Sequence, residues 1–185
     1  MNRMNATAND DLIDKLEQRV EKHLQEAIAT FQNLDTTVLL KPSATGGWSI
    51  AQCLEHLNRY GQYYLPEVKE RLERQTDSHV NNGIFKSTWL GSYFTKMMEP
   101  ETGKRKLPAF KEYKPPRDLD AHNIVSEFIT QQETMLKLLR AARHANLNVR
   151  VPISISRWIR LKLGDVLQFV IAHNERHIKQ AKRNL

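Results

Sequence analysis

Four stretches of this chain repeat apolar residues at steps of three and four, the spacing that places side chains on one face of an α-helix. The first runs from Leu12 to about Leu34, and the second from Ile50 to Leu72. The third follows a capping aspartate, Asp118 or Asp120, and the last begins near Leu163. Because each helix must bury its apolar stripe against another element, the pattern predicts that long helices pack together.

The start of the second helix has its own signature. Ser49 followed by Gln52 resembles a capping box, which predicts that the helix begins immediately after Trp48. Pro66 lies inside the same apolar row, where its missing N–H and its ring predict a kink or a restart of the helix.

The connections between these helices differ in character. Residues 89–98 are apolar and rich in aromatic residues, which predicts a short extra helix. Residues 99–117 contain four prolines and no periodicity, which predicts one long loop. The alternation in residues 149–156 predicts a short strand or an extended segment, and Pro152 confines it to an edge or a coil.

Together these segments predict an all-α fold, an up-down four-helix bundle with a short extra helix and a long loop between its second and third helices. A length of 185 residues favours one domain. We expect this domain to span residues 11–185, after a flexible leader at residues 1–10.

Composition bears on where the protein works. No apolar run approaches the roughly 20 residues of a membrane-spanning helix, and the first residues lack the apolar core of a signal peptide. Cys53 is the only cysteine, so the chain can form neither an internal disulfide nor a cysteine-rich zinc site. We therefore expect a cytoplasmic protein with no membrane partner, in which Cys53 is a small buried residue.

The net charge of +7 would permit contact with nucleic acid or with another acidic surface. The excess is concentrated in residues 86–117, which include the run from Lys104 to Lys106, and does not follow one helix face. We interpret it as a solvated basic loop. Because no groove-sized element interleaves aromatic with basic residues, we do not expect direct nucleic-acid binding.

Three histidines are the candidate metal ligands. His173 and His177 are four residues apart on the last helix, so their imidazoles lie one above the other, although this spacing also fits two boundary residues with hydrogen-bond partners. His56 shares one side of the second helix with Tyr60 and Tyr63, and side-by-side packing of the two helices would bring it beside the pair. Three neutral nitrogens with an open fourth position are typical of a catalytic zinc site, which we expect at the rim of the bundle.

The neighbouring polar residues are assigned other roles. Asn174 occupies the position where the His-Glu-x-x-His protease motif has its general base, so that motif is absent. Glu175 points away from the imidazoles on the helical wheel and is predicted to be solvated or salt-bridged. Tyr60 and Tyr63 are the candidates for a catalytic base. The other histidines are predicted to pack or to lie at the surface, with His79 a fourth ligand only if its loop folds back: His23, His79, His122 and His144.

Three motifs occur in a fixed order: Gly47-Trp-Ser-Ile-Ala-Gln-Cys-Leu-Glu-His56, then Gly164-Asp165, then Ala172-His-Asn-Glu-Arg-His177 with Gln180. In these motifs the chain resembles the DinB-like superfamily, also called the DinB/YfiT-like metal-dependent enzymes. The likeness covers nearly the whole chain after about residue 10, and it includes Trp89-Leu-Gly91, Leu107-Pro-Ala-Phe110, Pro116 and Val149-Arg-Val-Pro152.

The resemblance implies a four-helix bundle of up-down-down-up type, in which His56, His173 and His177 hold nickel, zinc or another divalent metal ion. Some related families use such a site for thiol transfer or for glutathione-dependent isomerisation. The chain departs from its relatives at Lys162, where they place Thr or Ser to cap the last helix. We expect Gly164-Asp165 to move that cap inward.

Three functions follow from these observations. The first is a metal-dependent transferase acting on a small molecule, with a low-molecular-weight thiol as substrate on the strength of the resemblance. The second is a metal-dependent hydrolase. The third is a non-catalytic interaction module of a stress-related protein, using residues 89–94 and the basic loop. A bundle with a surplus apolar helix also predicts a homodimer.

Overall fold

The computed structural model describes residues 7–44, 46–75, 83–103 and 109–185. Its helices are α1 (Asn9–Glu26), α2 (Thr36–Leu40), α3 (Ile50–Glu73), α4 (Trp89–Met98), α5 (Ala121–Ala142) and α6 (Leu163–Lys182), with a π-helical turn η1 (Ala27–Phe31) and a 3-10 turn η2 (Lys111–Tyr113). Its strands are β1 (Thr7–Ala8), β2 (Ile84–Phe85), β3 (Arg150–Ile153) and β4 (Ser156–Lys162).

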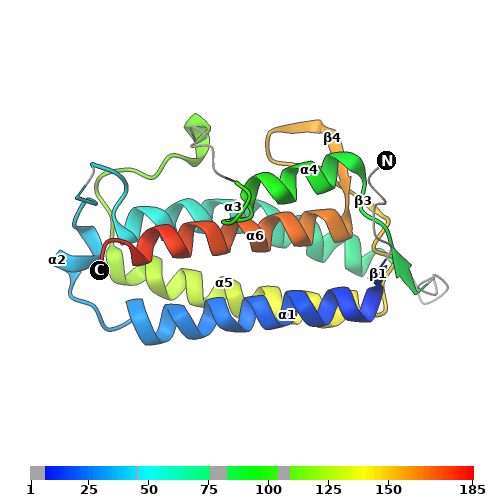
Figure 1. The fold of residues 1–185 in the computed structure, drawn as a ribbon, viewed down its shortest axis with the longest axis horizontal. Coiled ribbons are helices and arrows are strands. Elements are labelled where there is room, and N and C mark those ends of the chain that lie inside the picture. Colours follow the sequence, from blue (N-terminus) through cyan, green and yellow to red (C-terminus); the bar gives the residue numbers. More distant parts are fainter. Residues whose placement is uncertain (1–6, 45, 76–82, 104–108) are drawn as a thin grey trace.

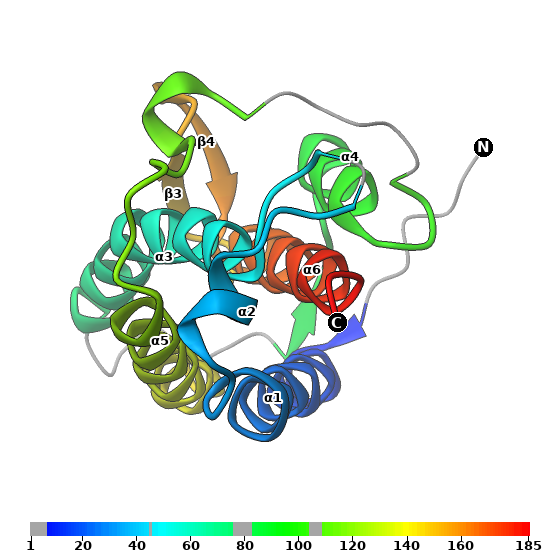
Figure 2. The ribbon, with the colours of Figure 1, turned by 90° about the vertical axis from the view of Figure 1, so that its left-hand side faces the viewer.

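The four long helices lie along the longest dimension of the molecule (Figure 1). Helix α3 packs against α5 and α6, and α1 packs against the same two helices. Figure 1 shows α1 and α6 running in one direction and α3 and α5 in the other. Seen end on, α4 and the β3–β4 hairpin lie on the α3 and α6 side, away from α1 and α5 (Figure 2). The predicted all-α fold is confirmed as a mostly helical structure.

The caps of two long helices agree with the sequence. Ser49 Oγ accepts from the backbone N–H of Gln52, and the Gln52 side chain accepts from the backbone N–H of Ser49, each at 3.1 Å. Asp120, the second of the two predicted caps, accepts from the backbone N–H of Asn123 at the start of α5. Helix α3 continues through Pro66, so the predicted restart does not occur. Pro66 is exposed, and so is Gln62, the residue whose carbonyl loses its helical partner.

The N-terminal region contains two elements that the periodicity did not predict. The first helix changes to the π-helical turn η1 after Glu26, and α2 follows with Leu39 as its buried residue. Of the predicted leader, residues 1–6 lie outside the described part, whereas Thr7 pairs with Phe85 and Ala8 with Ile84 in a short antiparallel ladder. The five residues of α2 are too few to show a helical period.

The predicted extended segment is strand β3, which pairs antiparallel with β4, a strand that the sequence did not predict. Pro152 lies opposite Arg160. A two-stranded hairpin consists only of edge strands, so the missing N–H of Pro152 is tolerated. Of the β4 residues with described burial, Leu161 alone is buried, and this explains why no alternating pattern marked the strand.

Helix α6 starts directly after β4, with Lys162 at its N-cap and no side-chain cap. The expected inward shift of the cap is wrong, because Asp165 accepts hydrogen bonds from the backbone N–H and the hydroxyl of Thr88 at 3.1 and 2.8 Å. Gly164 allows close packing here, since a Cβ at this position would meet the Phe85 ring at 2.7 Å. These contacts join the start of α6 to the segment that leads into α4.

Cys53 is buried, as predicted. Within the described ranges, no helix combines the length and the apolar character that crossing a membrane requires. Residues 104–106 of the predicted basic loop lie outside the described residues.

We expect Ser49→Ala to lower the free energy of unfolding by about 1 kcal/mol, because it removes the acceptor that caps α3. Ser126→Ala is the matched control, since Ser126 lies on the exposed face of α5. It should change the free energy by less than about 0.5 kcal/mol. Urea denaturation of the two variants measures the difference, and equal losses would show that the cap contributes nothing.

Candidate metal centre

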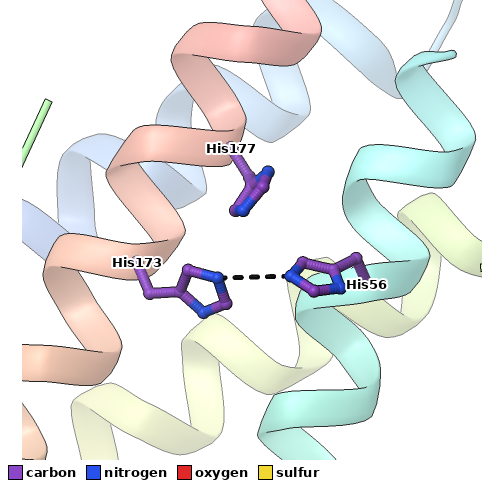
Figure 3. Close-up of side chains that lie close together, drawn as sticks. All are labelled: His56, His173 and His177. Atoms are coloured by element: carbon purple, nitrogen blue, oxygen red, sulfur yellow. Dashed lines mark hydrogen bonds between the residues drawn. The ribbon is translucent and has the colours of Figure 1, made fainter. Parts of the chain in front are cut away.

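The side chains of His56, His173 and His177 point toward one another between α3 and α6 (Figure 3). Helix α3 supplies His56, and α6 supplies the other two from adjacent turns. One nitrogen from each imidazole lies within 4.8 Å of the other two. Packing of α3 against α6 therefore brings together the three residues that the sequence singled out.

The three histidines belong to a band of polar side chains, which we call the polar layer. Along each long helix, residues of one apolar core lie on one side of this layer and residues of a second core on the other. All four long helices contribute buried polar side chains to the layer: His23 on α1, His56 and Asn58 on α3, Gln132 on α5, and His173 and Asn174 on α6.

Hydrogen bonding fixes the tautomer of one imidazole. His56 Nδ1 lies 2.7 Å from the backbone carbonyl of Tyr113, which can only accept, so this nitrogen carries the proton. Its Nε2 therefore carries a lone pair, which faces Nε2 of His173 at 3.3 Å (Figure 3). In metal sites, the ring nitrogen that does not bind the metal typically donates a hydrogen bond that orients the imidazole, as Nδ1 of His56 does here.

One pair of the three imidazoles has the nitrogen spacing of two ligands on one metal ion. Two nitrogens each bound at about 2.0–2.1 Å to one tetrahedral zinc ion lie about 3.3–3.4 Å apart. The separation between Nε2 of His56 and Nε2 of His173 is 3.3 Å. Among the described residues, Nδ1 of His173 and Nδ1 of His177 are buried and have no hydrogen-bond partner. Imidazole suits zinc, copper, iron and nickel, so the residues fit a divalent ion without selecting one.

The surroundings favour neutral imidazoles. Burial is the largest cause that lowers the pKa of each histidine, and it brings the pKa of His177 to about 3. Positive charge adds to the effect, from Arg59 on His56 and from Arg176 on His173 and His177. The neutral imidazole is the form that binds a metal ion, so the fold holds these side chains ready to act as ligands.

Aromatic rings enclose the site. Trp48 stacks on His177 with ring centroids 5.7 Å apart, and Tyr60 meets His173 edge-on at 4.6 Å. Tyr113, from η2, stacks on Tyr60 at 4.1 Å. These rings form an apolar wall beside the imidazoles.

The site lies deeper than the helical wheel indicated. His56 and His173 are each 3% exposed, and His177 retains somewhat more exposure. Trp48 stacks on His177 and the carbonyl of Tyr113 binds His56, and both residues belong to segments without helical periodicity.

The residues between the two α6 histidines bind different neighbours. Asn174 donates to Gln132 Oε1 of α5 at 3.2 Å, inside the polar layer. Glu175 accepts from Nε and Nη2 of Arg19 on α1 at 3.0 and 2.7 Å, and Arg19 also binds Glu99. The predicted salt-bridged role of Glu175 agrees with these contacts.

Arg176 faces a third neighbour. Its Nη1 donates to the backbone carbonyls of Met97 at 3.1 Å and Gly103 at 2.6 Å. It therefore ties the end of α4 and the start of the long loop to the helix that carries two of the histidines. No sequence pattern predicts this bond, because its acceptors are backbone carbonyls, which every residue has.

The two candidate bases occupy different surroundings. Tyr60 lies against the rings of His56 and His173, and burial raises its pKa above its usual range. A phenol with a raised pKa stays protonated at neutral pH, so Tyr60 can donate a proton but is a poor base. Tyr63 meets the ring of Tyr64 edge-on.

The remaining histidines divide into three groups. His122 and His144 are exposed near the two ends of α5, as predicted. His79 lies outside the described residues. His23 is 2% exposed within the polar layer, and burial is the main cause that lowers its pKa to about 3.

Comparison with known proteins places these motifs in a family. The family model of the DinB superfamily matches residues 19–181 of the chain, which include all three histidines. Searches of curated proteins and of solved structures found no significant match.

His23 predicts an acid-dependent loss of stability. Its pKa is about 3 in the folded chain, against about 6.5 for an unperturbed histidine, so the unfolded chain takes up the proton first. The stability that the neutral His23 imidazole contributes is fully present above about pH 6.5 and is lost as the pH falls toward about 3. The charged groups that act on His23 are Glu175, which opposes the shift, and Arg19, Lys22 and Lys179, which add to it.

Between about pH 7 and about pH 5, the parent should lose about 2 kcal/mol more stability than His23→Leu, which cannot take up the proton. Urea denaturation of both proteins over this range gives the free energy of unfolding of each as a function of pH. An equal change with pH in the two proteins would contradict the assignment of a buried neutral imidazole.

Proposed function

Because this chain belongs to the DinB superfamily, we propose that it is a metal-dependent enzyme whose ligands are His56, His173 and His177. The observation that carries the proposal is the convergence of three buried imidazoles from two helices, with one nitrogen of each within 4.8 Å of the others and the His56 and His173 nitrogens 3.3 Å apart. The proposal includes the up-down-down-up four-helix bundle as the scaffold, formed by α1, α3, α5 and α6, with zinc or nickel as the ion.

The reaction we propose is thiol transfer to a small electrophilic substrate. A divalent ion at this site would lower the pKa of a bound thiol and so supply a nucleophile at neutral pH. The chain's own groups support such a role. Trp48, Tyr60 and Tyr113 exclude water from one side of the imidazoles, and the protonated phenol of Tyr60 is a donor beside His173.

Positive charge near the triad supports an anionic substrate. Arg59, Arg176 and Arg183 all act on the histidines, and each lowers the pKa of at least one of them. The same charges stabilise a thiolate relative to its thiol. The two acids nearest the histidines in sequence are paired with basic side chains. Glu55 binds Arg59, and Glu175 binds Arg19 and Lys179.

We expect the purified parent to contain close to one equivalent of a divalent metal, and His56→Gln and His173→Gln to lose it. Each substitution removes one of three ligands while keeping a polar side chain of similar size. His122→Gln and His144→Gln are matched controls on exposed positions and should retain the metal. Elemental analysis after growth in metal-replete medium measures this. A metal-free parent, or equal metal content in all variants, would contradict the proposal.

We expect the metal-loaded parent to conjugate a low-molecular-weight thiol to an electrophilic acceptor, with the rate at least about 100-fold lower in His56→Gln. The measurement is a product assay with panels of thiols and electrophiles, run beside panels of esters and amides. Turnover of esters or amides without thiol consumption would replace the proposed reaction with hydrolysis.

A further inference from the structure

Two neighbouring segments expose large apolar side chains that the metal site does not use. Trp158 on β4 is 95% exposed and Trp89 on α4 is 73% exposed. Tyr93, one turn after Trp89, stacks on it with ring centroids 6.0 Å apart and is also exposed. Ile155 and Ile159 of the hairpin are exposed as well.

The two segments that carry these side chains lie on one side of the molecule. Strand β4 contacts α4, and Nζ of Lys162 donates to the carbonyl of Lys86 just before α4, at 2.9 Å. Alternation along β4 places Trp158 and Arg160 on the same face as Lys162. Figures 1 and 2 show α4 and the hairpin projecting from the same side of the long helices. We call the surface formed by residues 83–98 and 149–162 the exposed face.

The hairpin is held in place and does not fold back over its own apolar residues. The Tyr64 hydroxyl, on α3, donates to Ser154 Oγ at 3.2 Å and accepts from the Ser154 backbone N–H at 3.1 Å. Nη1 of Arg150 donates to the carbonyl of Arg160 across the hairpin. Trp158 is therefore presented to solvent on an anchored element.

The two segments of the exposed face contain basic residues and no acidic ones. Their residues include six Lys or Arg and no Asp or Glu, whereas the rest of the chain has 22 basic and 21 acidic residues. The six basic residues are Lys86, Lys96, Arg150, Arg157, Arg160 and Lys162. Any partner of this face must therefore be acidic and must also accept tryptophan and isoleucine side chains.

We propose that the exposed face binds peripherally to an anionic lipid bilayer. Tryptophan and tyrosine favour the membrane–water interface, where the ring reaches the acyl chains and the polar edge remains hydrated. Isoleucine gains from burial below the headgroups, and basic side chains gain from anionic lipid. The face contains all three kinds of residue.

Two other occupants satisfy fewer of these features. A second copy of the chain would bring two sets of basic residues together with no acidic residue between them, which opposes association. Nucleic acid would satisfy the charges and could stack on Trp89 or Trp158, but it offers no apolar phase for Ile155 and Ile159. The expected absence of a membrane partner rested on the lack of a spanning segment, and peripheral binding requires none.

The test is co-sedimentation of the full chain with vesicles of phosphatidylcholine containing phosphatidylglycerol, compared with vesicles of phosphatidylcholine alone. The parent should bind the anionic vesicles and lose this binding as salt is raised. Trp158→Ser should weaken binding about tenfold or more, and Lys86→Glu about fivefold or more.

Matched controls come from the opposite side of the molecule. Ile28→Ser in η1 and Lys137→Glu in α5 replace exposed residues and should leave vesicle binding unchanged. His56→Gln should also bind like the parent, because the exposed face does not depend on the proposed metal site. The vesicle assay therefore tests membrane binding independently of the proposed enzyme function.

Three results would overturn the proposal. One is equal binding to both kinds of vesicle, or no binding to either. Another is a dimer in sedimentation that Trp158→Ser dissociates, which would assign the face to a second copy. The last is binding of the parent to DNA, with a steep salt dependence, when the parent does not bind anionic vesicles.

Discussion

The layer of buried polar side chains determines how the long helices pack against one another. The two apolar cores on either side supply most of the driving force, but apolar contact is non-directional and tolerates sliding. A buried polar group without a partner costs about 1–3 kcal/mol, so the helices favour a register in which Asn174 meets Gln132 and His56 meets His173. The cores therefore stabilise the fold, and the polar layer selects one arrangement of it.

The rotation of α6 about its own axis follows from the same principle. Asn174, Glu175 and Arg176 leave the helix in successive directions about 100° apart, and each is bound by a different element. A helix held from α5, from α1 and from the end of α4 cannot turn without breaking one of these bonds. His173 and His177 lie on the face that remains, directed at α3. The site is thus oriented by residues that do not belong to it.

The sequence predicted whatever depends on periodicity or on local capping. The long helices, the capping box at Ser49 and the pairing of His56 with the α6 histidines all follow from spacing and family motifs. It did not predict the burial of the triad, because Trp48 and Tyr113 cover it from segments with no period. It also missed β4, since a strand with so few buried residues has no alternating signal.

The charge of the polar layer bears on which molecule would complete the proposed site. Three imidazoles are neutral ligands and leave the full charge of a divalent ion uncompensated, while Arg176 adds to the positive potential and Arg59 is paired with Glu55. An uncompensated charge in a buried site is costly, so an anion is favoured there. Hydroxide cancels one of these charges, whereas a thiolate on a molecule that also carries carboxylates cancels several. Under the proposed function, this difference in charge favours thiol transfer over hydrolysis.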